Sequence, residues 1–95
     1  MQAHKQSAKA ARERAKTLAI EALGFIAEQP QSLARFLDAS GIEAEEIRTA
    51  ARGDGFLAGV LEHMLSDETL VLAFAARAGI DPAEVGQAAR TLGSG

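Results

Sequence analysis

Residues 74–90, FAARAGIDPAEVGQAAR, contain a complete boundary between two helices and decide the fold class. Gly79 follows a run of helix-favouring residues, and its missing Cβ permits the left-handed conformation that commonly ends a helix. The next segment, DPAE, offers Asp81 as an N-cap, Pro82 at the first helical position and Glu84 for a capping box. This stretch therefore predicts one helix that ends at Gly79, a tight corner, and a second helix that begins after Asp81.

The same preference for helix extends along the whole chain. Alanine supplies 21 of the 95 residues, Leu, Glu and Arg are frequent, and β-branched and aromatic residues are sparse. This composition favours helices and disfavours a sheet. Because a chain of this length forms one small domain, we expect an all-α fold, a compact bundle of five to six short helices.

Hydrophobic periodicity and capping signals divide the chain into six helical segments. The predicted helices cover residues 10–28, 32–40, 43–52 and 56–65, a fifth from an N-cap at Ser66 or Asp67 to Gly79, and a sixth after Asp81. The fifth segment, TLVLAFAARA, is apolar nearly all round, which is typical of a helix surrounded by others. We therefore expect the fifth helix at the centre of the bundle.

The two halves of the chain resemble each other. A shift of 38 residues superposes Phe36 on Phe74, Gly41 on Gly79, Ile42 on Ile80, Glu46 on Glu84, and residues 50–52 on residues 88–90. Two pseudo-repeated three-helix units would explain these matches. Chance is the other explanation, since alanine matches are common in this composition and two repeats are fewer than a solenoid needs.

Charge is distributed unevenly along the chain. Residues 1–16 hold five of the ten Lys and Arg and one acid, whereas residues 17–95 carry five bases against twelve acids. We predict a basic, mobile arm over residues 1–14 and a single acidic domain over residues 15–93. The arm is either a solvated helix start or a phosphate-binding segment, whose candidate contacts are Lys5, Lys9, Arg12, Arg14 and Lys16.

The corner at Gly79 has the spacing of a DNA-binding helix-turn-helix. Ala75, Gly79 and Val85 occupy the small, turn and anchor positions, and the corner at Gly41 matches less well. A helix that enters a groove of DNA needs cations to neutralise phosphates. Because the outward positions after the Gly79 corner include Asp81 and no lysine, the sequence favours a packing corner over a DNA reader.

No constellation of residues indicates catalysis. Cysteine is absent, which excludes a disulfide, a thiolate metal site and a cysteine nucleophile. His4 and His63 have no metal-ligand or nucleophile partner near them in sequence. Glu43, Glu45 and Glu46 stand at a helix start, where acids favour the helix dipole. With no phosphate loop or dinucleotide fingerprint either, we expect no catalytic, cofactor or metal site and no enzyme activity.

The chain shows no sign of targeting to a membrane. Its basic N-terminus lacks the apolar run of a secretory signal. The most apolar window, residues 56–80, is interrupted by Glu62, His63, Asp67 and Glu68, whose insertion into a bilayer is costly. We therefore expect a cytoplasmic protein without membrane contact.

The order of several short elements resembles a known family. The elements LGF, FL…SG, GFL…VL and LAFA…AGIDP, spread over residues 16–92, are similar to those of short alphaproteobacterial proteins catalogued only as a domain of unknown function. The resemblance implies an all-helical fold. It implies no enzyme activity and brings no established binding residues.

These observations predict a non-catalytic protein-binding or regulatory module with an unidentified protein partner. Gaps between short helices are suited to accept a partner helix. Candidate partner contacts are Phe25, Leu57 and Met64. The alternative is a nucleic-acid-binding protein that uses the basic arm or the helix-turn-helix-like corner.

Overall fold

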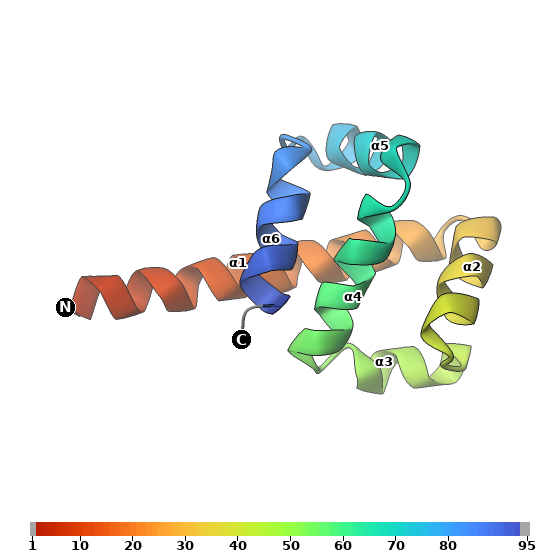
Figure 1. The fold of residues 1–95 in the computed structure, drawn as a ribbon, viewed down its shortest axis with the longest axis horizontal. Coiled ribbons are helices and arrows are strands. Elements are labelled where there is room, and N and C mark those ends of the chain that lie inside the picture. Colours follow the sequence, from red (N-terminus) through yellow and green to blue (C-terminus); the bar gives the residue numbers. More distant parts are fainter. Residues whose placement is uncertain (1, 94–95) are drawn as a thin grey trace.

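The chain folds into a bundle of helices, as expected (Figure 1). A computed structural model describes residues 2–93, with side chains from residue 8 onward. The elements are α1 (Gln2–Ala27), α2 (Pro30–Ser40), the 3₁₀ turn η1 (Ala44–Glu46), α3 (Ile47–Ala50), α4 (Asp54–Leu65), α5 (Glu68–Ala78) and α6 (Ala83–Gly93). Residues 2–93 contain no strand, and the all-α fold class is confirmed.

The core forms where α1, α4 and α6 pack against one another, with α5 across one end (Figure 1). On α4, Val60, Leu61 and Met64 have no exposed surface. Ile26 of α1 and Val85 of α6 are equally inaccessible and belong to the same hydrophobic cluster. Burial of a large aliphatic side chain contributes about 1.5–3 kcal/mol, so this three-helix contact dominates the stability of the fold.

The expectation that the fifth helix is central is wrong, because α4 occupies that place. Phe74 of α5 is buried, but Leu72 is 51% exposed, and Ala73 and Ala76 also face outward. Alanine is too small to report which side of a helix is buried. The apolar composition of α5 therefore does not distinguish a surrounded helix from one that covers an end of the bundle.

Both predicted glycine corners are confirmed. Gly41 and Gly79 follow α2 and α5 with φ values of 73° and 71°, in the left-handed region. The backbone N–H groups of Gly79 and Ile80 both donate to the carbonyl oxygen of Ala75. These bonds satisfy a carbonyl left open by the end of the helix, so the chain turns sharply toward α6.

The helix starts predicted from capping signals are also present. The side chain of Asp81 accepts from the Ala83 N–H at 2.9 Å, and the Glu84 carboxylate accepts from the Asp81 N–H at 3.2 Å. Asp67 caps α5 by accepting from the Leu70 N–H at 3.3 Å. The sequence therefore determines both ends of the link between α5 and α6.

The predicted third helix, residues 43–52, is interrupted: η1 comes first and α3 has only four residues.

The predicted internal repeat is matched by the helix boundaries of the two halves. The shift of 38 residues maps Pro30–Ser40 onto Glu68–Ala78, and residues 16–27 onto Asp54–Leu65. The third segments differ, because α6 has eleven residues and packs against α4 and α1. Helix boundaries thus recur in the two halves, while the packing of the last helix does not. A duplicated unit stays a prediction.

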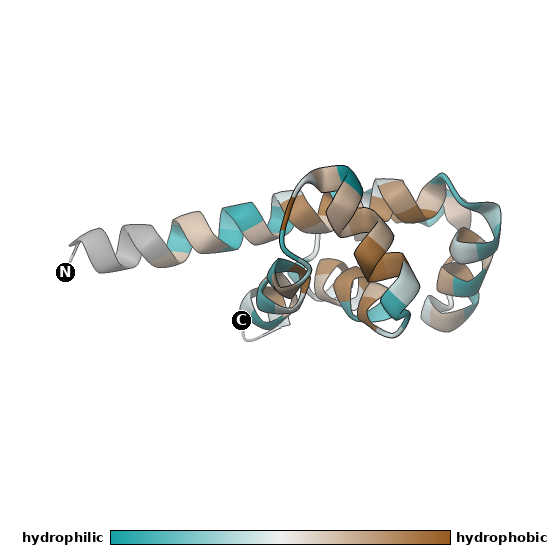
Figure 2. Ribbon diagram, turned by 90° about the horizontal axis from the view of Figure 1, so that it is seen from above, coloured by the Kyte–Doolittle hydropathy of each residue, from teal (hydrophilic) through white to brown (hydrophobic). Residues whose placement is uncertain are grey.

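Residues 2–14, predicted as an arm, form the first half of α1, and Met1 lies outside the described residues. The turns of α1 before residue 11 extend beyond the other helices in Figure 1, and Figure 2 shows the bundle from a second side. The side chains of residues 8–10 are exposed, and burial begins at Ala11 and Arg12. The mobility of the arm stays a prediction.

Substitution at the centre of α4 should cost far more stability than substitution on the outer face of α5. Leu61→Ala removes buried methyl groups and leaves a cavity, so we expect a loss of about 2–5 kcal/mol. Leu72→Ala should cost less than about 1 kcal/mol. Urea denaturation followed by circular dichroism measures both, and equal losses would contradict the central position of α4.

Candidate functional site

Of the three predicted partner contacts, two are buried in the core and one is half-buried. Leu57 is 2% exposed and Met64 is fully buried, so both belong to the core of α4 instead of a contact surface. Phe25 is half-buried: its ring centroid lies 5.6 Å from that of Phe74, and the Arg77 guanidinium lies 5.6 Å from its ring centroid. Helical periodicity identified the apolar face of α4 correctly, but the face lies against α1 and α6.

The predicted nucleic-acid contacts also fall into two groups. Arg12 and Lys16 form ion pairs with Asp54, whereas Lys9 and Arg14 are exposed and make no ion pair within residues 8–93. The side chain of Lys5 lies outside the described residues. Two of the five cations are therefore engaged by the protein itself.

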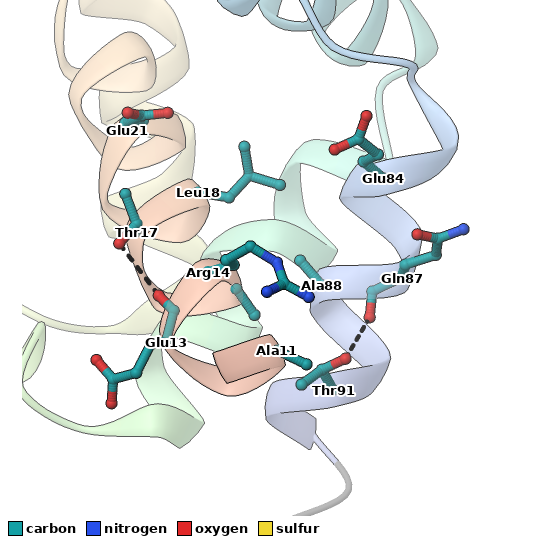
Figure 3. Close-up of a pocket in the computed structure, with 11 residues that line it drawn as sticks. Ala11, Glu13, Arg14, Thr17, Leu18, Glu21, Glu84, Gln87, Ala88 and Thr91 are labelled. Atoms are coloured by element: carbon teal, nitrogen blue, oxygen red, sulfur yellow. Dashed lines mark hydrogen bonds between the residues drawn. The ribbon is translucent and has the colours of Figure 1, made fainter. Parts of the chain in front are cut away.

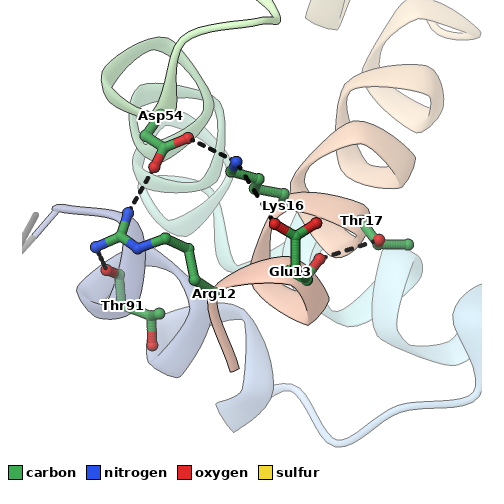
Figure 4. A network of polar contacts seen from close by, with 6 residues as sticks. All are labelled: Arg12, Glu13, Lys16, Thr17, Asp54 and Thr91. Carbon is green, nitrogen blue, oxygen red and sulfur yellow. Dashed lines mark hydrogen bonds and ion pairs between the residues drawn. The ribbon is translucent and has the colours of Figure 1, made fainter. Parts of the chain in front are cut away.

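A polar network joins α1 to the start of α4 and the end of α6 (Figure 4). Arg12 Nη1 donates to Asp54 Oδ2 at 2.6 Å, and Arg12 Nη2 donates to the Thr91 carbonyl oxygen at 3.2 Å. Lys16 Nζ lies 3.5 Å from Asp54 Oδ1. Asp54 is also in the first turn of α4, where a negative charge favours the helix dipole. About a third of each side chain is exposed, so each contact contributes modestly.

A groove of about 480 Å³ lies between α1 and α6 (Figure 3). We call it the α1/α6 groove. Small and aliphatic side chains line it together with hydroxyls, an amide, three acids and one arginine: Ala11, Glu13, Arg14, Ala15, Thr17, Leu18, Glu21, Glu84, Gln87, Ala88 and Thr91. In Figure 3 the Arg14 side chain reaches from α1 toward α6. The groove therefore combines an apolar lining with a mainly acidic rim.

A smaller and more apolar groove, of about 280 Å³, lies between α2 and α4. We call it the α2/α4 groove. Its lining residues are Phe36, Ala39, Ser40, Phe56, Gly59 and His63. The Phe36 ring meets the Phe56 and His63 rings edge to face, with centroids 5.6 Å and 5.3 Å apart. This groove has the aromatic lining that is common where proteins take up an apolar group.

The corner between α5 and α6 packs as the sequence favoured. Ala75 is 2% exposed and Val85 is fully buried, while Asp81, Ala83 and Gln87 are exposed. The outward face of the corner thus presents an acid where a DNA reader presents cations. A helix-turn-helix role gains no support from this arrangement.

The described residues show neither a membrane-spanning helix nor a cluster of metal ligands. Within residues 2–93, no helix is both long and apolar enough to cross a membrane. The described side chains, those of residues 8–93, form no group of three or more His, Cys, Asp or Glu that could hold a metal ion.

Comparison with known proteins identifies the family but not the activity. Residues 12–95 match the model of a family described as "protein of unknown function (DUF3572)". The chain belongs to this family. The match confirms the predicted membership of a family of unknown function, and it begins at Arg12, so it includes the network around Asp54. No curated protein and no solved structure matches the chain.

The network at Asp54 should show measurable coupling between its members. In a double-mutant cycle with Arg12→Ala and Asp54→Ala, we expect a coupling free energy of about 0.5–1 kcal/mol that falls at high salt. The control is the pair of Arg77 and Glu28, which forms two hydrogen bonds at 2.9 and 3.0 Å. Its side chains are 60% and 55% exposed, so solvent should keep its coupling at about 0.5 kcal/mol or less. Urea denaturation provides the four stabilities of each cycle. Zero coupling at Asp54 would show that the network does not hold α1.

Proposed function

We propose that this protein is a non-catalytic binding module whose α2/α4 groove takes up an apolar side chain from a helix of a partner protein. The proposal includes a cytoplasmic setting, which the cysteine-free sequence supports. Helix-in-groove recognition uses one or a few apolar side chains that insert between helices of the receptor. Three aromatic rings around one opening suit such an insertion.

Gly59 is the observation that carries the proposal. It lies in the middle of α4, where glycine costs about 0.5–1 kcal/mol relative to alanine. The fold does not require this glycine, since its φ is not positive and a Cβ built on it meets nothing within 4 Å. The open space above Gly59 is part of the α2/α4 groove. A glycine there keeps the groove deep enough for an incoming side chain.

The surroundings of the groove suggest the character of the partner. His63 also lines a neighbouring cavity of about 290 Å³, together with Ser32, Arg35, Ser66, Asp67, Glu68 and Leu70. This second cavity offers hydroxyl groups and charges of both signs. A partner helix with an apolar residue for the groove and polar residues on an adjacent turn would satisfy both cavities.

Filling the groove at Gly59 should abolish partner binding without harm to the fold. Gly59→Leu and Gly24→Leu both place a leucine at an exposed position in the middle of a helix, and neither meets another atom near its Cβ. Both variants should be as stable as the parent or more stable, because leucine favours helix. Only Gly59→Leu should prevent the formation of a partner complex.

The measurement is photo-crosslinking in cells that naturally express the protein, with a photoreactive residue in place of Ala39 at the groove. The expected result is a discrete crosslinked partner that persists with Gly24→Leu and disappears with Gly59→Leu. A crosslinked product of equal yield in both variants, or none in the parent, would refute the proposal.

A further inference from the structure

Within residues 2–93, the first turns of α1 have no neighbouring helix. α1 has 26 residues, which corresponds to a length of about 39 Å, and the longest dimension of the molecule is 45 Å. Figure 1 shows this part of the helix beyond α6, and the side chains of residues 8–10 are exposed. Short helical segments gain most of their stability from packing. A surface that packs against this unpacked helix start would therefore stabilise it.

The charge and composition of this segment indicate what that surface is. Residues 2–10 contain two lysines, no acid and three alanines. The α1/α6 groove has the complementary character, since Glu13, Glu21 and Glu84 outnumber Arg14 among its charged residues. Glu21 makes no ion pair within residues 8–93 and is exposed. The chain thus carries both a basic, alanine-rich helix and an acidic groove lined with small residues.

The two features also match in length and direction. Residues 2–10 form about 14 Å of helix, and the part of α1 that lines the groove, residues 11–21, forms about 16 Å. The segments follow each other on one helix, so a two-fold axis perpendicular to α1, and beside it near their boundary, places each segment antiparallel to the other segment of a second copy. Ala11 is partly exposed and leaves room for a partner backbone, while Ala15 and Ala88, which are 4% and 6% exposed, form the buried base of the groove.

We propose that the α1/α6 groove binds the first turns of α1 from a second copy of this chain, in a two-fold symmetric dimer. Each copy gives its basic helix start and receives that of its partner, so the contact is closed and self-complementary. The interaction uses a different groove from the one proposed for a heterologous partner. Exposed charges contribute to it, so the dimer weakens as salt shortens the range of the attraction from about 10 Å at 0.1 M to about 3 Å at 1 M.

A charge exchange between two variants of the intact chain tests the proposal. The arm variant carries Lys5→Glu and Lys9→Glu, and the groove variant carries Glu21→Lys and Gln87→Lys, two exposed positions of the groove. Like charges then meet in each homodimer, so self-association of either variant, measured by sedimentation equilibrium at low salt, should weaken about tenfold or more. In an equimolar mixture, opposite charges meet at both contacts, and a heterodimer should form.

Two controls separate this effect from unfolding and from net charge. Far-UV circular dichroism and thermal melting verify that both variants keep the fold. A control variant with Glu45→Lys and Thr49→Lys changes the net charge by the same amount as the groove variant, at exposed positions outside the groove. This control should dimerise like the parent.

Three results would overturn the proposal. The parent chain stays a monomer at low salt up to the highest soluble concentration, or both variants dimerise as well as the parent, or each variant loses dimerisation but the mixture does not recover it. A monomeric parent that binds a mixed-sequence DNA duplex, with binding lost in the arm variant, would assign the basic helix to nucleic acid instead. None of these results bears on the α2/α4 groove, which Gly59→Leu tests separately.

Discussion

The contact that α4 makes with α1 and α6 supports everything else in this structure. Val60, Leu61 and Met64 are inaccessible to solvent because two other helices cover them, and α2 and α5 pack at the margins of that contact. A chain with so much alanine has few large side chains to bury, so it concentrates them on one helix and surrounds that helix. The α2/α4 groove borders α4 directly, whereas the α1/α6 groove lies between the other two helices of this contact.

The position of α1 relative to this core depends on charge as well as on packing. Arg12 reaches both Asp54 and the carbonyl of Thr91, so one side chain links the first half of α1 to the start of α4 and to the end of α6. The network stands beside the α1/α6 groove, and Glu13 belongs to both. The residues that anchor α1 to α4 and α6 therefore lie next to the residues that line the groove.

Local signals in the sequence predicted local structure well. Gly79, Asp81 and Glu84 predicted the corner between α5 and α6 correctly. The backbone groups at a helix end are satisfied by residues close in sequence, so the local sequence is sufficient to locate that end. The centre of the bundle could not be found in the same way, since alanine occupies exposed and buried positions of α5 alike. The pairing of Arg12 with Asp54 spans 42 residues, and no periodicity reports a partner at that distance. The α2/α4 groove was missed for a similar reason, although an unexplained glycine in the middle of a predicted helix was a signal that could have indicated it.

Among residues 8–93 no polar or charged side chain is buried, and no buried side-chain nitrogen or oxygen lacks a hydrogen-bond partner. Apart from ring pairs such as those of Phe25 with Phe74 and of Phe36 with Phe56, a core without polar groups has no directional contact that specifies a unique arrangement of its side chains. Apolar residues of similar volume can therefore replace one another there at a cost of less than about 1.5 kcal/mol. Uniqueness of the fold rests instead on the glycine corners and helix caps, whose geometry admits few residue types. Related sequences with the same fold would then vary more among the apolar residues of the core than at the glycine corners and helix caps. This is the reverse of the usual expectation for a globular domain.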